Sequence, residues 1–209
     1  MNEFTGVVTA EEEIRDIIGY PSELVNHKII DHIDNHCRDY IAKTSLLFIS
    51  TSDGQGHCDV SPRGDAPGFV TIIDNKRLII PERPGNRRID SIRNILSNPH
   101  VGLIFLIPGL EETLRINGRA YVIKDKALLE PMHVNGKAPL LGIGVVVEEC
   151  YMHCAKAFKR SRAWEPESWL EEGLLPKPAK IIAAHAREMN VTEESVAASL
   201  RESYAKRLY

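Results

Sequence analysis

The chain has few cysteines. Its 209 residues include only four, Cys37, Cys58, Cys150 and Cys154, which are too few and too scattered for the disulfide scaffold of a small secreted domain. Their number is typical of a protein whose thiols stay reduced, so we expect a cytoplasmic location. Cys150 and Cys154 flank His153, but this irregular cluster lacks the paired short cysteine spacings of structural zinc sites. No metal site is predicted.

Long apolar runs and a basic excess are also missing. The longest apolar run, Val101–Ile107, is too short to span a bilayer, and residues 1–9 lack the basic and apolar regions of a signal peptide. Lys and Arg number 26 against 29 Asp and Glu, for a net charge of -3, whereas nucleic-acid-binding domains usually carry a basic excess. We therefore expect neither membrane insertion nor nucleic-acid binding.

Several well-known catalytic motifs are absent as well. No Gly-x-Gly-x-x-Gly turn, Gly-x-Ser-x-Gly elbow or Walker phosphate loop occurs, which argues against a dinucleotide-binding fold, an α/β-hydrolase and a P-loop enzyme. His32 and His36 are four residues apart on an expected helix, but no Glu follows His32 as a His-Glu-x-x-His zinc motif requires. We interpret both histidines as solvated side chains.

The hydrophobic pattern divides the chain into three zones of one expected domain, residues 1–209, because 43% of the residues are hydrophobic and can build a single core. Residues 10–43 place apolar side chains at helical spacing. Residues 153–209 are also predicted to be helical, with two proline breaks and a charged C-terminal helix. The breaks are Pro176 and Pro178, and the last helix is expected from about Glu193.

Residues 44–152 have the pattern of short strands joined by turns. A helix over 88–97 interrupts them and ends at Asn98-Pro99, because the residue before a proline disfavours helical geometry. Short strands joined by turns favour antiparallel pairing, and this number of strands predicts a closed or nearly closed barrel. The fold class is therefore mainly β, with flanking helices. The expected strands are 46–49, 58–62, 69–73, 78–80, 101–107, 113–123 and 143–150.

A candidate phosphate site lies in Ile80–Ser91. A strand ends there, Pro84-Gly85 makes a tight loop, and a helix is expected from about Asn86. The free N–H groups of a helix N-terminus favour anions, and Arg87 and Arg88 add planar donors suited to phosphate oxygens. The alternative is a solvated basic turn before a helix.

Three further segments place polar side chains together. Strand alternation puts Asp59, Ser61 and Arg63 on one face, and Thr113, Arg115 and Asn117 on another. Each of these could instead be an ordinary half-exposed strand. Lys156 and Arg160 are four residues apart on one face of an expected helix, and Trp164 either closes the core or stacks on a bound ring.

Taken together, these segments resemble those of the pyridoxamine 5'-phosphate oxidase-like FMN-binding split-barrel superfamily. The matching pieces are Ser61–Asp65, the Pro84–Arg88 loop before a short helix, the strand 112–118, and 153–164 with its His-Cys-Ala-Lys-Ala and Arg-Ser…Trp pattern. The resemblance covers roughly 28–170 and is strongest to a bacterial branch described as FMN-dependent enzymes.

The resemblance implies an antiparallel split β-barrel that forms a homodimer with two FMN sites at the subunit interface. It implies phosphate contacts from residues at the start of the short helix, with Arg63 as a further candidate. The cofactor-binding residues expected on this basis and from the patterns above are Ser61, Arg63, Pro81, Asn86, Arg87, Arg88, Thr113, Arg115, Lys156, Arg160 and Trp164.

The activity implied is that of an oxidoreductase acting on an unidentified small-molecule substrate or electron acceptor. Reduced flavin transfers a hydride without a side-chain acid or base, so no catalytic residue is named. By the same resemblance, Thr113 stands where pyridoxamine 5'-phosphate oxidases carry a glutamine. The C-terminal Arg-Leu-His-Asp-Arg segment of those enzymes has no match in this chain. Oxidation of pyridoxamine phosphate is therefore not expected. Two alternatives remain: a deazaflavin or another reductant on the same barrel, and a non-enzymatic flavin- or haem-binding sensor or storage protein.

Overall fold

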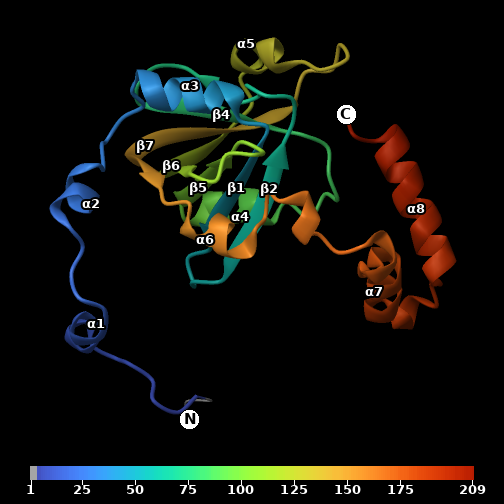
Figure 1. The fold of residues 1–209 in the computed structure, drawn as a ribbon. Coiled ribbons are helices and arrows are strands. Elements are labelled where there is room, and N and C mark those ends of the chain that lie inside the picture. Colours follow the sequence, from blue (N-terminus) through green and yellow to red (C-terminus); the bar gives the residue numbers. More distant parts are fainter. Residues whose placement is uncertain (1–3) are drawn as a thin grey trace.

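A computed structural model describes residues 4–209. Its central feature is a seven-stranded antiparallel sheet with the strand order β2-β1-β5-β6-β7-β4-β3, which curls around one apolar core (Figure 1). The predicted mainly β class with helices at both ends of the chain is confirmed. The strands are β1 Leu46–Ser52, β2 Cys58–Gly64, β3 Thr71–Ile72, β4 Arg77–Glu82, β5 His100–Leu106, β6 Thr113–Ile123 and β7 Leu141–His153.

The sheet is not closed, so of the two predicted forms, closed or nearly closed, the fully closed one is not present. β2 and β3 are its two edges and are not hydrogen-bonded to each other. β3 pairs with β4 through only Thr71 and Ile72, and so short a strand offers no ladder that β2 could join. The expected hairpin of 69–73 with 78–80 is present, because β3 and β4 are antiparallel.

The core fills the concave face of this sheet. Alternate residues of the central strands are fully buried, among them Leu103, Phe105 and Ile116, as the period of two in a strand requires. Helix α3, Asn35–Lys43, covers the core, and its Tyr40 hydroxyl donates to the carbonyl of Phe105 at 3.2 Å. Buried apolar area of this kind is the main force that stabilises the sheet.

The N-terminal zone forms three short helices rather than one long series. Helices α1 Glu11–Ile18 and α2 Glu23–His27 precede α3, and the chain leaves helical geometry between α2 and α3. There Ile30 exchanges backbone hydrogen bonds with Cys150 of β7, at 3.1 and 2.7 Å, which replace the bonds that a helix would have made. His32 lies in this break, so His32 and His36 do not share a helix.

Helix α4, Asp90–Ser97, begins later than the expected Asn86. Arg87 and Ile89 have φ angles of 63° and 56°, and this left-handed geometry cannot belong to a right-handed helix. Asn86, Arg87 and Arg88 therefore lie in a loop that precedes the helix. The end of α4 before Asn98-Pro99 is as predicted.

The C-terminal zone contains short helices, and α7 and α8 lie side by side, apart from the sheet (Figure 1). Pro178 occupies the first turn of α7 rather than breaking a helix, because proline lacks only an N–H that is unpaired there. The start of α8 at Glu193 is confirmed.

The remaining elements are α5 Lys126–Leu129, α6 Lys156–Ser161, α7 Pro178–His185, α8 Glu193–Lys206 and the 3-10 turns at Glu130–Met132, Pro166–Ser168, Glu172–Leu174 and Arg187–Met189.

Across residues 4–209, no helix combines the length and the apolar character needed to cross a membrane.

Candidate functional site

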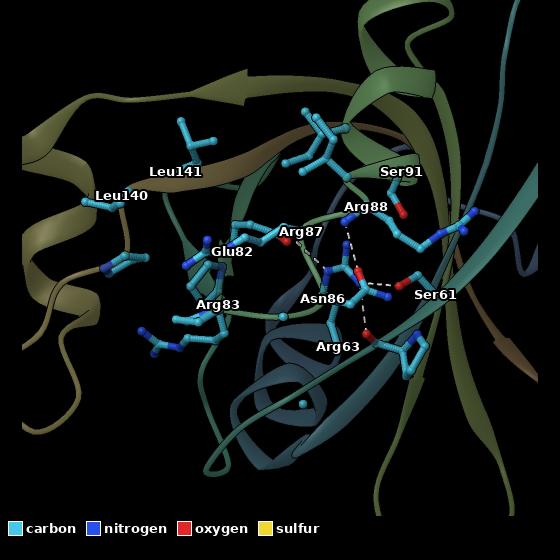
Figure 2. Close-up of a pocket in the computed structure, with 18 of the residues that line it drawn as sticks. Ser61, Arg63, Glu82, Arg83, Asn86, Arg87, Arg88, Ser91, Leu140 and Leu141 are labelled. Carbon is cyan, nitrogen blue, oxygen red and sulfur yellow. Dashed lines mark hydrogen bonds and ion pairs between the residues drawn. The ribbon is translucent and has the colours of Figure 1, made fainter. Parts of the chain in front are cut away.

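A cavity of about 1140 Å³ opens between β2, the end of β4, the loop before α4, and the segment before β7. Figure 2 shows its two ends, with Ser61, Arg63, Asn86 and Arg88 at one and Leu140 and Leu141 at the other. The first end is polar, with three arginines beside the carboxylates of Asp59, Glu82 and Asp90, and the second carries the apolar side chains of Leu140 and Leu141. A small molecule with an anionic tail and a flat apolar body matches this division.

The polar wall comes from β2, whose alternation is as predicted. Asp59, Ser61 and Arg63 are partly buried and line the cavity, while Val60 between them is 63% exposed. Ser91 in the first turn of α4 donates its hydroxyl to Asp59 Oδ2 at 2.7 Å. This bond fixes the start of α4 against β2, so the polar end of the cavity has a rigid wall.

Arg63 and Glu82 meet inside the cavity without a proper hydrogen bond. Arg63 Nε lies 3.3 Å from Glu82 Oε2, with the side chains only 16% and 25% exposed, yet both atoms are buried and lack a hydrogen-bond partner. Burial raises the pKa of Glu82, and the charge of Arg63 opposes that rise. Because buried polar atoms are nearly always hydrogen-bonded, the Arg63 N–H that Glu82 leaves without a hydrogen bond is a candidate donor to a ligand acceptor.

The loop over 83–89 is strained where it borders the polar end. A positive φ is rare for a β-branched residue such as Ile89, and each such residue costs about 1–3 kcal/mol. The Arg88 side chain pairs through Nε with Asp90 at 2.8 Å. The backbone N–H of Arg88 donates to Asn86 Oδ1 at 3.0 Å. Arg87 also lines the cavity and, within the described part of the chain, forms no ion pair, so its guanidinium is available to an anion.

The cavity lining also contains Arg83 and Tyr209, for which the sequence predicted no role. Arg83 Nε pairs with Asp65 Oδ2 at 2.7 Å, and the Asp65 side chain is only 2% exposed. The Tyr209 hydroxyl donates to Asp65 Oδ1 at 2.8 Å. Burial would raise the pKa of Asp65, but its hydrogen bonds with Ala66, Tyr209 and Arg83 outweigh burial and lower it. Asp65 therefore stays ionised and holds Arg83 in place.

The structure separates the predicted site residues into two groups. Those of the first group all line the cavity, and those of the second lie outside it. The second group lies on β6, on α6 and just after α6. Lys156 and Arg160 lie on the same helix, as predicted. The first group is Ser61, Arg63, Pro81, Asn86, Arg87 and Arg88, and the second is Thr113, Arg115, Lys156, Arg160 and Trp164.

Two members of the second group make aromatic contacts outside the cavity. Arg115 lies over the ring of Tyr151 at 5.8 Å from the centroid, because β6 and β7 pair these two residues. Trp164 stacks on Phe158 at 5.5 Å between centroids and donates its indole N–H to the Leu110 carbonyl at 3.0 Å. Trp164 therefore packs locally and is not among the residues that line the cavity.

No group of three or more His, Cys, Asp or Glu side chains is arranged to hold a metal ion among residues 4–209. Cys150 is buried in the core whereas Cys154 is exposed. The cluster of Cys150, His153 and Cys154 in the sequence is therefore not a cluster in space.

Comparison with known proteins identifies the class to which this fold and cavity belong. The sequence profile described as pyridoxamine 5'-phosphate oxidase matches residues 33–154, which is more than half of the chain. The chain belongs to the pyridoxamine 5'-phosphate oxidase family. No match was found among curated proteins.

Solved structures similar to this chain include one named for FMN and one named for haem. HupZ of Group A Streptococcus is 21% identical, with a TM-score of 0.47, over 57% of this chain and 93% of that one. An FMN-binding protein from Syntrophomonas wolfei is 10% identical, at 0.43, over 69% and 97%. The haem storage protein HutZ from Vibrio cholerae is 12% identical, at 0.38, over 58% and 93%. These structural similarities are too weak to identify either the family or a ligand. We therefore assign the family from the profile match alone.

Proposed function

We propose that this protein binds FMN in the cavity and acts as an oxidoreductase on a small-molecule substrate or electron acceptor. The observation that carries the proposal is the arginine-bearing end of the cavity, where the buried Arg63 Nε faces Glu82 without a hydrogen bond and Arg87 has no ion-pair partner among the described residues. Guanidinium groups are the preferred donors to phosphate oxygens. Family membership supports the same cofactor.

The residues present fit FMN better than they fit FAD or haem. The chain has no Gly-x-Gly-x-x-Gly turn for a dinucleotide. Haem iron is usually held by His, Cys, Met or Tyr, and among the described residues that line the cavity only Tyr209 is of these types. The Tyr209 hydroxyl is already bonded to Asp65. A single terminal phosphate at Arg63 and Arg87 is therefore the simplest occupant.

Each part of the cavity has a role in this proposal. Bound FMN would supply the two-electron redox chemistry, and the protein would bind and orient it. Arg63 and Arg87 hold the phosphate, and the Ser91–Asp59 hydrogen bond keeps the wall behind it rigid. Leu140 and Leu141 give the other end an apolar surface against which a flat ring would pack.

The first expected result is that the released chromophore is FMN. The purified protein is denatured by heat, and the supernatant is examined by absorption spectroscopy and mass spectrometry. A yellow supernatant with the mass of FMN supports the proposal. Recovery of FAD or of haem contradicts it, as does a protein that takes up no flavin when FMN is added.

The second expected result is a homodimer with FMN at the subunit interface. A second copy supplies the groups that one protomer keeps outside its own cavity, namely Arg115, Lys156 and Trp164. Closed two-fold assembly is the commonest form of homo-oligomer. Light scattering of the FMN-loaded protein is expected to give twice the 23.4 kDa chain mass. A mass of one chain with FMN bound would contradict an interface site.

The third expected result is poor oxidation of pyridoxamine 5'-phosphate. A phosphorylated substrate needs an anion site separate from that of the cofactor, yet the segment 164–172 is acidic, and like charges oppose phosphate binding. With FMN-loaded protein under oxygen, we expect kcat/KM below about 10⁴ M⁻¹s⁻¹, the lower end of ordinary enzyme values. A value above that limit would show that this account of specificity is wrong.

A further inference from the structure

Two cysteines from distant parts of the sequence meet away from the cavity. Cys37 lies in the first turn of α3 and Cys150 in the middle of β7. Their Sγ atoms are 3.4 Å apart, and 113 positions of sequence separate them. Cys150 is fully buried and Cys37 is partly exposed. Cys37 is therefore the less buried member of the pair, and Cys150 lies in the core beside it.

The surroundings make Cys37 the more reactive thiol. The Cys150 thiol donates its hydrogen to Cys37 Sγ, which lowers the pKa of Cys37 despite its burial and the nearby Asp34 carboxylate. The same hydrogen bond and burial raise the pKa of Cys150. A position in the first turn of a helix also favours a thiolate, because the N–H groups there carry partial positive charge. Together with its lesser burial, this favours Cys37 as the nucleophile and Cys150 as the resolving thiol.

We propose that Cys37 and Cys150 form a peroxide-sensitive redox site that closes to an intramolecular disulfide. The Cys37 thiolate attacks hydrogen peroxide, the O–O bond breaks, and a sulfenic acid forms with release of one water after proton transfer. Cys150 sulfur then attacks the Cys37 sulfur, the S–O bond breaks, and its hydroxyl group leaves with the Cys150 proton as a second water. Two thiols are oxidised to one disulfide and one peroxide is reduced to two waters.

The disulfide would clamp the N-terminal segment onto the sheet. Cys150 is the residue whose backbone pairs with Ile30, and Lys28 Nζ donates to the neighbouring Met152 carbonyl at 2.8 Å. A covalent link from α3 to β7 at this point holds both contacts together. The reduced pair leaves the docking of residues 28–37 dependent on hydrogen bonds and packing. The proposal does not depend on the identity of the cofactor in the cavity.

The test treats the full-length protein with a small excess of hydrogen peroxide, blocks free thiols, and maps cysteine peptides by mass spectrometry without reduction. The expected product is a Cys37–Cys150 linked peptide, two hydrogens lighter than the separate peptides, that dithiothreitol reverses. Because a cross-link over so long a loop stabilises the folded state, Tm is expected to rise by roughly 10 °C. The Cys37→Ala and Cys150→Ala variants are expected to lose both effects.

A Cys58→Ser, Cys154→Ser variant is the matched control, because both of these thiols are exposed and lie outside the pair. It is expected to form the disulfide and gain the same Tm shift as the unchanged protein. If peroxide takes Cys37 to sulfinic acid without a link, the proposal is overturned. The same holds if the link requires Cys58 or Cys154, or if the pair stays reduced while the exposed thiols are oxidised.

Discussion

Replacement of Arg87 by alanine is expected to weaken FMN binding by about tenfold or more, while riboflavin binding changes little. The guanidinium of Arg87 lines the cavity and has no ion-pair partner within residues 4–209. Its removal therefore eliminates a hydrogen-bond donor to the ligand and breaks no ion pair within the protein. A hydrogen bond to a charged group is worth about 1.5–3 kcal/mol, and about 1.4 kcal/mol is tenfold in affinity. Titration with both flavins, followed by fluorescence or calorimetry, measures the difference.

Arg93→Ala is the matched control for this experiment. Arg93 is an exposed arginine on α4, close in sequence to the loop but outside the cavity lining. Its replacement is expected to leave both affinities unchanged while removing the same charge. Equal losses for FMN and riboflavin in Arg87→Ala would mean that Arg87 does not bind the phosphate. Equal losses for FMN in both variants would point to general charge attraction instead of a specific contact.

Replacement of Gly118 by alanine is expected to destabilise the protein by more than about 3 kcal/mol. The ladder between β6 and β7 shifts register at Asn117 and Gly118. A Cβ on Gly118 would lie 2.1 Å from the Val146 carbonyl oxygen. Because that oxygen belongs to the backbone of the adjacent strand, relief of the clash requires the two strands to separate. Urea unfolding curves of the two proteins give the loss of stability.

Gly54→Ala controls for the substitution itself. Gly54 lies in the turn between β1 and β2, and a Cβ there meets nothing within 4 Å. Its free energy of unfolding is expected to change by no more than about 0.5 kcal/mol, as for most surface changes. A Gly118→Ala protein as stable as the Gly54→Ala protein would show that β6 and β7 are not paired in this register.

Strand alternation was the part of the site that the sequence could predict. A period of two brings Asp59, Ser61 and Arg63 to one face regardless of what lies around them, and the structure places them in the cavity wall. The start of α4 could not be predicted in the same way. Ordinary residues such as Arg87 and Ile89 adopt left-handed geometry there, and no glycine marks the position.

Long-range pairing is the part that pattern reasoning missed. Tyr209 and Asp65 are 144 positions apart, and no local period connects them. Arg83 belongs to the segment singled out for phosphate binding, yet it pairs with Asp65. Closure of the sheet is also a long-range property, because it depends on whether the two edge strands, β2 and β3, meet. β3 is too short for this, and its length is known only from the folded structure.

A crystal structure of the protein grown with FMN tests the central claim most directly. The account predicts flavin density in the cavity between β2, β4 and the loop before α4, with phosphate oxygens within about 2.7–3.2 Å of the guanidinium nitrogens of Arg63 and Arg87. It also predicts that the flavin ring lies toward Leu140 and Leu141. Flavin bound at another place, or with its phosphate away from both arginines, would contradict the account.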